Sequence, residues 1–321
     1  MPHRDIQAEI EKLNLLRGAP PREAAARLRK ALADRVNLVT AKAARLVAEL
    51  KLVDLVPDLL RAFERLLENG AERDPQCWGK NAIAKALVDL DHRESAPFLS
   101  GMRHIQMEAT WGKSEDMAQN LRGICVLALA ACTDIPRPHI LRHLVDALTD
   151  AAPTVRVEAL RAIEQMDGEE AALVLRLKAH LGDEEPPVIG QAFDSLLHLE
   201  SERALPFVAG FLNAPSQEIR EEAALSLGTS RLPGALEILR QALAAGSSPE
   251  FRPVLLRAIS SSRQEEALAF LLALVRDGEA AALEALALHR ASPDIRARVE
   301  QTVQGAGPRI GRLFGELFPS Q

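Results

Sequence analysis

The sequence of 321 residues contains no tyrosine, and aromatic residues make up only 3% of it. Only three cysteines are present, Cys77, Cys125 and Cys132, and they lack CxxC or zinc-type spacing. A disulfide framework is therefore not expected, as is typical of a reducing compartment. The charged N-terminal segment has no signal-peptide core, and no apolar run approaches the roughly 18 residues of a membrane span. We expect a cytoplasmic protein that does not enter the membrane.

Sequence motifs of several enzyme classes are also missing. The chain has no GxGxxG, P-loop, GxSxG, HExxH or CxxC site. This absence weakens an enzymatic interpretation without excluding it, and it gives no reason to expect a cofactor. The formal net charge of −6 disfavours a general nucleic-acid binder, whose domain is usually basic.

The residues that are abundant favour helices. Leu and Ala dominate the apolar residues, and both have high helix propensity. Val and Ile occur mostly singly at helical spacing, and we find no run that alternates with the period of two typical of strands. The sequence therefore predicts an all-α fold.

One pattern of small or apolar residues at i, i+4 and i+8 occurs seven times. Residues at this spacing lie on one face of a helix, so each segment predicts a buried stripe. A second amphipathic segment follows each one after a short polar connection, which predicts stacked helix hairpins. The stripes begin at Val39, Gly79, Leu121, Val155, Val188, Ile219 and Phe251.

An acidic residue often precedes a basic residue by six positions at the start of these helices. A carboxylate there can accept hydrogen bonds from the unpaired N–H groups of the first turn. The acidic residues are Asp34, Asp74, Asp116, Asp150 and Asp183, and the basic ones are Lys80, Arg122, Arg156, Arg220 and Arg252. Thr40 and Ile189 replace the basic residue in two repeats. Ala214 and Gly246 replace the acidic one, so we expect this ladder to be interrupted at all four positions.

Segments such as LTDAAPTVRVEALRAIEQM (148–166) resemble HEAT repeats, specifically the short type named after phycobilisome lyases. The resemblance covers about residues 34–290 and implies an α-solenoid of about seven or eight helix pairs. We expect N-terminal capping helices over 1–33, the repeat solenoid over 34–304 and a C-terminal capping helix over 305–321. Together they are expected to form one continuous domain.

The longest repeat contains the stretch HIQMEATWGKSED (104–116), in which a tryptophan lies among charged residues. Insertions in solenoids map to loops, and loops frequently carry function. We therefore predict a non-enzymatic protein-binding or scaffold solenoid that recognises another protein around this loop. The candidate binding residues are Trp78, Arg103, His104, Glu108, Trp111, Lys113 and Arg142. Alternatively, each tryptophan is buried beneath the loop, and residues 112–115 lead into the next helix.

Other functions stay open at this point. The resemblance also implies HEAT-like enzymes, either bilin lyases or DNA glycosylases, although no motif here carries over their catalytic residues. A basic stripe on second helices, expected on the concave face, would instead receive an acidic partner or nucleic acid. Its residues are Arg61, Arg65, Arg103, His104, Arg142, His143, Arg176 and Lys178.

Two further side-chain arrangements are weak candidates for chemistry. His139, His143 and Asp146 share one side of a predicted helix, flanking a core stripe of Leu141, Leu144, Val145 and Leu148, and their spacing could supply three metal ligands. A solvated surface is the simpler interpretation. Cys77 lies at a helix start, where a thiolate could be stabilised, but structural burial is favoured.

Overall fold

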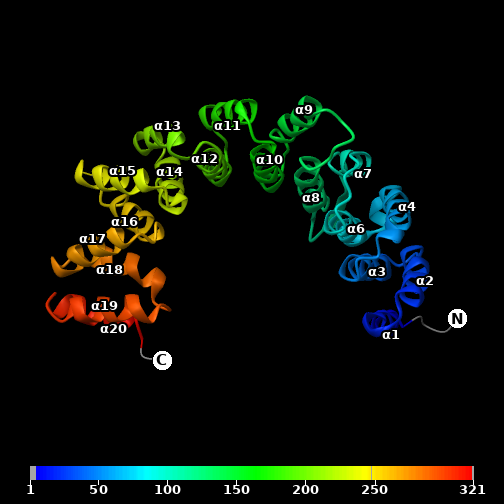
Figure 1. Cartoon of the computed structure of the whole chain (residues 1–321), viewed down its shortest axis with the longest axis horizontal. Helices are drawn as coiled ribbons and strands as arrows, with labels where there is room; N and C mark the ends of the chain where they lie inside the picture. Colours follow the sequence, from blue (N-terminus) through cyan, green and yellow to red (C-terminus); the bar gives the residue numbers. More distant parts are fainter. Residues whose placement is uncertain (1–4, 247, 320–321) are drawn as a thin grey trace. The chain divides into compact units, whose positions relative to one another are not determined.

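The computed structural model describes residues 5–246 and 248–319. The chain divides into two compact units, Met1–Met166 and Asp167–Gln321, and each is described by itself. Within the described residues the regular structure is helical apart from one two-stranded hairpin, which confirms the all-α prediction (Figure 1). The expectation of one continuous domain with separate capping segments stays a prediction.

The first unit consists of two layers of helices (Figure 1). The outer helices are α2 (Pro21–Leu32), α4 (Val56–Leu67), α7 (Ala96–Gly101) and α9 (Arg137–Ala147). The inner helices are α3 (Asn37–Glu49), α6 (Trp78–Asp89), α8 (Gln119–Leu129) and α10 (Pro153–Met166). Two further helices are α1 (Ile6–Asn14), which packs on α3, and the single turn α5 (Gly70–Arg73).

The second unit repeats this arrangement. Its outer helices are α11 (Glu169–Leu181), α13 (Leu205–Gly210), α15 (Pro233–Ala244) and α17 (Glu265–Arg276). Its inner helices are α12 (Pro186–Glu200), α14 (Gln217–Ser230), α16 (Arg252–Ser261) and α18 (Ala280–Leu286). The last two helices are α19 (Pro293–Val303) and α20 (Pro308–Leu317), and α20 packs on α18 and α19.

The main helix pairs begin one helix earlier than the sequence predicts. Helix α4 packs chiefly on α6, α7 on α8, α9 on α10 and α11 on α12. The helices expected to be first in each pair are therefore the inner ones, and their main partner is the preceding outer helix. A stripe pattern marks the buried face of a helix, but it does not mark which neighbour shares that face.

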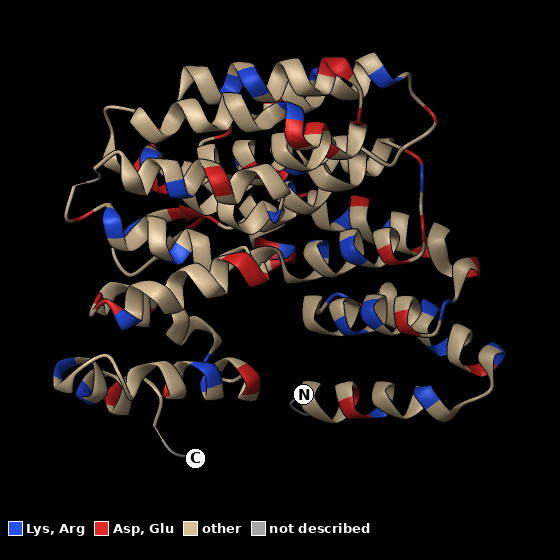
Figure 2. Cartoon of the chain, turned by 60° about the vertical axis from the view of Figure 1, so that its left-hand side comes forward, with Lys and Arg blue, Asp and Glu red and all other residues tan. Residues whose placement is uncertain are grey.

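This shift corrects the expected basic stripe. Its eight residues lie on α4, α9 and α11 or directly after α7, all in the outer layers, so they do not line an inner face. Figure 2 shows basic and acidic residues side by side along the helices of both units. The stripe prediction was wrong because it depended on the helix-pair assignment.

The predicted apolar stripes form the core of both units. Every residue of the seven stripes is buried except Ile219, which is half-buried. Removing such side chains from water is the main favourable term in folding. None of the helices in the described ranges is long and apolar enough to cross a membrane.

The predicted acidic residues do begin the inner helices, and they act on their own turns. In four repeats one carboxylate oxygen accepts the backbone N–H two residues further on. The pairs are Asp34 with Val36 (2.8 Å), Asp116 with Ala118 (2.9 Å), Asp150 with Ala152 (2.8 Å) and Asp183 with Glu185 (3.0 Å). The carboxylate thus accepts a backbone N–H at the helix start that has no carbonyl partner within the helix.

Two positions at which the ladder was expected to be interrupted keep their hydrogen bond. The Thr40 hydroxyl donates to the Asp34 carbonyl at 3.1 Å. Arg220 donates to the Ala214 carbonyl at 2.8 Å, although no carboxylate is present there. Since the acceptor is a backbone carbonyl, any residue at the turn supplies it, and the helix start is tied down without the pair of Asp carboxylate and Arg.

Glycine decides how closely α14 and α16 approach. A Cβ added at Gly228 would collide with the backbone carbonyl of Ala258, whereas one added at Gly210 meets nothing within 4 Å. We therefore expect Gly228→Ala to lower the free energy of unfolding of the second unit by about 1–3 kcal/mol, as overpacking typically does. Urea unfolding followed by circular dichroism at 222 nm would measure it. Gly210→Ala is the matched control and should be neutral or stabilising; equal destabilisation by both would contradict the close approach.

Candidate functional site

The 104–116 stretch forms an antiparallel hairpin that the sequence did not predict. Strand β1 (Met107–Thr110) pairs with β2 (Lys113–Asp116), and Trp111 and Gly112 form the turn. Gly112 has φ +82°, a conformation that glycine adopts without strain. Residues 112–115 therefore do not lead into a helix, since α8 begins only at Gln119. Four-residue strands are too short to show a clear alternation of two.

The hairpin exposes apolar side chains at its tip and edge. Trp111 is fully exposed, so the alternative that it is buried beneath the loop is wrong. Ile105 is 67% exposed and Met107 53% exposed, which adds two apolar side chains on the first arm. Trp78, at the start of α6, is 44% exposed. Large exposed apolar side chains gathered on one element mark interaction sites more often than chance.

The other predicted residues fall into two groups. Arg103 and Lys113 are exposed close to the hairpin, whereas His104 and Glu108 are half-buried and point into hydrogen bonds. Arg142 lies on outer helix α9, and no hydrogen bond or ion pair within the described residues joins it to the hairpin. Of the residues predicted from the sequence, Arg103, His104, Glu108 and Lys113 thus lie in or close to the hairpin, whereas Arg142 lies on another helix.

Gln106, which sequence reasoning missed, fixes the base of the hairpin. Its side chain is buried, and Nε2 donates to the Asp74 carbonyl at 2.9 Å and to Glu108 Oε1 at 2.6 Å. Its backbone N–H donates to Asp116 Oδ1 at 3.0 Å. The sequence carried no signal for it, because a polar residue between Ile105 and Met107 predicts an exposed side chain, the reverse of what the structure shows.

Gln106 connects the hairpin to a fully buried ion pair. Lys80 Nζ lies 3.1 Å from Asp74 Oδ2, and neither side chain is exposed. The Asp74 carboxylate also accepts the backbone N–H groups of Gly79 at 2.7 Å and of Lys80 at 2.9 Å, and the Asn37 side-chain amide at 2.9 Å. Lys80 Nζ donates further to the Leu66 carbonyl at 3.1 Å. These extra hydrogen bonds offset the cost of removing two charges from water.

The turn between Asp74 and α6 is strained, and the hairpin helps to hold it. Gln76 and Cys77 are consecutive non-glycine residues with φ of 59° and 56°, in the left-handed region that costs about 1–2 kcal/mol for each residue. Glu108 Oε1 accepts the Gln76 N–H at 2.7 Å, and the Asp74 carbonyl accepts the Cys77 N–H at 3.0 Å. Glu108 thus has a structural task in this turn.

Cys77 is fully buried in this turn, as the sequence favoured. Burial raises the pKa of its thiol to about 12, an effect that Lys80 opposes and Asp74 adds to. The thiol is therefore protonated at neutral pH, and a thiolate nucleophile is not available there.

Two titratable residues complete the base of the hairpin. Burial lowers the pKa of His104, and its Nε2 lies 3.1 Å from Gln106 Oε1. Burial opposes ionisation of Asp116, but hydrogen bonds from the backbone of Gln106 and Ala118 and from Arg122 outweigh it, so the pKa of Asp116 is lowered. Arg122 also donates to the Asp150 carboxylate at 2.7 and 2.9 Å, which joins the hairpin base to the next repeat.

The family model for HEAT repeats matches residues 174–260 and 212–289. The chain contains HEAT repeats. No protein of curated function matches it significantly in sequence.

Several solved structures are similar to this HEAT-repeat protein. The complex of CpcE and CpcF of phycocyanin lyase from Nostoc sp. is 18% identical over 76% of this chain and 94% of that chain, with a TM-score of 0.35. Human deoxyhypusine hydroxylase in complex with glycerol is 22% identical over 83% and 93%, with a TM-score of 0.31. An engineered protein is 17% identical over 91% and 81%, with a TM-score of 0.33. At these low scores nothing about activity follows.

The weak metal candidates of this HEAT-repeat protein lie on α9. His139 and Asp146 are exposed and His143 is half-buried. Of the predicted stripe, Leu144 and Leu148 are buried, Leu141 is half-buried and Val145 is 39% exposed, while Ile140 and Ala147 complete the buried face. Within the part of the chain that the structure describes, no group of three His, Cys, Asp or Glu side chains is placed to hold a metal ion.

Removing the Asp74 carboxylate leaves the Lys80 ammonium buried without its counter-charge. We expect Asp74→Ala to lower the free energy of unfolding of the first unit by about 3–5 kcal/mol, the usual cost of breaking a buried pair. Tryptophan fluorescence during urea unfolding reports on this unit, because both tryptophans lie in it. The control Glu68→Ala removes the exposed pair with Arg73 and should cost less than about 1 kcal/mol. Similar losses of unfolding free energy in the two variants would show that the buried ion pair stabilises the unit no more than the exposed one.

The lowered pKa of His104 predicts a pH dependence of stability. The unfolded chain binds a proton at this histidine near its ordinary pKa of about 6.5, more readily than the folded one. The free energy of unfolding should therefore fall as the pH drops from 7 to 5, and this loss should be smaller in His104→Gln. His139→Gln changes an exposed histidine and should keep the wild-type dependence. Identical pH profiles for all three proteins, from urea unfolding, would refute the role of His104.

Proposed function

We propose that this HEAT-repeat protein is a non-enzymatic protein-binding or scaffold solenoid whose recognition surface includes the β1–β2 hairpin. One observation carries the proposal. Trp111 is fully exposed at the tip of a hairpin whose base is fixed by buried hydrogen bonds. A soluble protein gains no stability from this ring, whereas a partner that covers it gains a large apolar contact.

The anchored base makes the exposed tip suitable for recognition. Tryptophan is enriched among the few interface residues that carry most of the binding energy. Binding also costs less entropy when the contact residues are already ordered. Gln106 and Glu108 provide this order, because they fasten β1 to the Asp74 turn. In the proposal, Trp111, Met107 and Ile105 make the apolar contact.

The charged residues around the tip supply polar contacts at the edge of such an interface. Lys113 is exposed at the start of β2, and Arg103 is exposed four residues before β1. Rim charges of this kind influence association rate and partner choice more than affinity. His104 and Glu108 position the hairpin. Trp78, on α6, is a second candidate contact. A cytoplasmic location, and binding without a cofactor, belong to the same proposal.

The proposal is tested by affinity capture from a lysate of the source cells, with quantitative mass spectrometry. Trp111→Ala should reduce recovery of the captured proteins at least about 30-fold, the effect of losing a contact worth 2 kcal/mol or more. Its urea unfolding should equal that of the wild type, because the ring is fully exposed. Leu173→Ala is the matched control, since it removes a 57% exposed apolar side chain from the second unit.

Two outcomes would contradict the proposal. Trp111→Ala could recover the same proteins in the same amounts as the wild type. Alternatively, Trp111→Ala and Leu173→Ala could reduce recovery equally, which would indicate general adhesion to exposed apolar side chains.

A further inference from the structure

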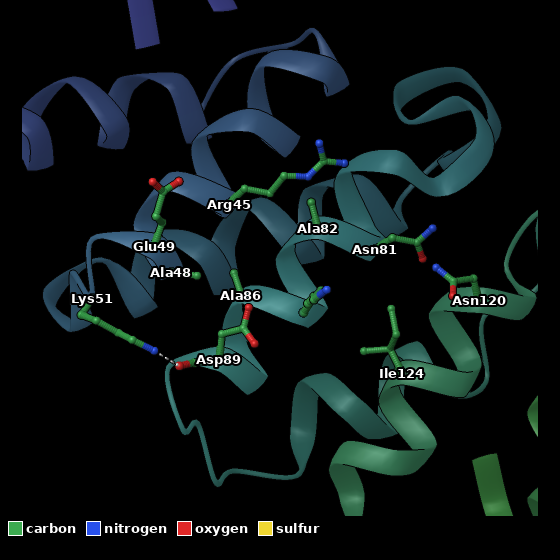
Figure 3. A pocket seen from close by; sticks show the side chains of 11 residues that line it. Arg45, Ala48, Glu49, Lys51, Asn81, Ala82, Ala86, Asp89, Asn120 and Ile124 are labelled. Carbon is green, nitrogen blue, oxygen red and sulfur yellow. Dashed lines mark hydrogen bonds between the residues drawn. The ribbon is translucent and has the colours of Figure 1, made fainter. Parts of the chain in front are cut away.

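A groove of about 600 Å³ crosses the inner helices α3, α6 and α8 of the first unit (Figure 3). Its floor contains the small side chains Ala48, Ala82 and Ala86, and Ile124 of α8 closes one side. Charged and amide side chains stand around this floor. The groove is separate from the hairpin residues of the proposed function, and the sequence did not indicate it.

Two hydrogen bonds show that α3 and α6 run parallel and in register. At their N-terminal ends, the Asn37 amide donates to Asp74. At their C-terminal ends, Lys51 Nζ donates to the Asp89 carbonyl at 2.7 Å. Residues one repeat step apart therefore lie side by side, and Arg45 and Lys85 are such a pair. Packed helix axes lie about 8–10 Å apart, so these two side chains leave the inner face from positions about one helix spacing apart.

Arg45 and Lys85 are exposed, and neither takes part in an ion pair within the described residues. The nearby Glu49 carboxylate is already engaged, since Arg17 donates two hydrogen bonds to it. Burial and the charges of Arg17 and Arg45 lower the pKa of Lys42 on the same helix. Cations are thus crowded along α3, and an added anion would relieve their repulsion. Asp89, one turn after Lys85, is the opposing charge of the lining.

Side-chain amides form the third part of the groove. Asn81 Oδ1 is buried and has no hydrogen-bond partner. Figure 3 shows the amides of Asn81 and Asn120 pointing toward each other across the groove between α6 and α8. The Asn120 side chain is exposed, and its amide can donate to and accept from the backbone of a bound peptide.

We propose that this groove binds an acidic segment of a partner protein in an extended, polyproline-like conformation. Two carboxylates three residues apart would pair with Arg45 and Lys85, and the peptide backbone would meet the Asn120 amide. A polyproline helix has three residues per turn and rises about 3.1 Å per residue, so such carboxylates point the same way about 9 Å apart. This spacing matches neighbouring helices. The inference rests on the proposed function, because it names the chemistry of the partner.

The lining favours an acidic peptide over a nucleic acid. Glu49 and Asp89 would repel a continuous run of phosphates, whereas they leave room for carboxylates placed three residues apart. Arg45 can also bind a carboxylate through two parallel N–H groups, the preferred geometry of guanidinium.

Helix α6 carries both groove residues and Trp78. Positions 78, 81 and 85 share one face of α6, so Trp78 lies at the N-terminal end of the row that contains Asn81 and Lys85. The Gln76 N–H, two residues before Trp78, donates to Glu108 of the hairpin. One partner could therefore contact both surfaces.

The test uses the purified full chain and a fluorescein-labelled nonapeptide of proline and alanine with glutamates at positions 3 and 6. Fluorescence anisotropy should show saturable binding that weakens about tenfold in Arg45→Gln/Lys85→Gln, the effect of losing two ion pairs of modest strength. Arg22→Gln/Lys30→Gln is the matched control, with an exposed arginine and an exposed lysine removed from outer helix α2, and should bind as the wild type. The same peptide with glutamines should bind at least about tenfold more weakly.

Three results would overturn the proposal. The glutamine peptide could bind as tightly as the glutamate peptide, or the groove variant could bind as the wild type. A single-stranded oligonucleotide of nine nucleotides could bind more tightly than the peptide and lose affinity in the groove variant, which would indicate a phosphate site. Trp111→Ala separates the two proposals. If peptide binding fails while Trp111 is still needed for affinity capture, the groove inference alone is wrong.

Discussion

The buried Asp74–Lys80 ion pair joins helices α3, α4 and α6 and the β1–β2 hairpin of the first unit. A carboxylate and an ammonium with no exposure are stable only when further hydrogen bonds accompany their mutual attraction. The chain meets this condition by drawing in distant groups, namely the Asn37 amide, the Leu66 carbonyl and the backbone of α6. The Asp74 backbone carbonyl also accepts a hydrogen bond from the Gln106 side chain, which joins the hairpin to the same network.

This constraint explains why strain is tolerated beside it. Gln76 and Cys77 adopt left-handed backbone conformations, and both N–H groups are held by acceptors of the same network. The hydrogen bonds that fix the turn also fix the strand that carries Glu108. Rigidity of the hairpin base and exposure of its tip are therefore two consequences of one network. A tryptophan on an ordered hairpin is suited to recognition, because little conformational entropy is lost on binding.

The two proposed surfaces differ in their physical basis. The hairpin offers exposed apolar area, and its residues stood out in the sequence as an unusual stretch. The groove offers unpaired cations on α3 and α6 and an exposed amide on α8, so it combines three inner helices of different repeats. Arg45 and Lys85 are 40 residues apart and look ordinary in the sequence. They become neighbours only because α3 and α6 stack in register.

The sequence by itself determined the helices, the buried stripes and the carboxylates at the helix starts, because these depend on local spacing along one helix. It could not determine which helix each stripe faces, so the pairs were assigned one helix late and the basic residues to the wrong layer. It also missed the hairpin, since four-residue strands show no periodicity. The roles of Gln106 and of the Asp74 network depend on tertiary structure, because the hydrogen-bond partners of these buried polar groups lie about 30 residues away in the sequence. Only three-dimensional packing brings such partners together.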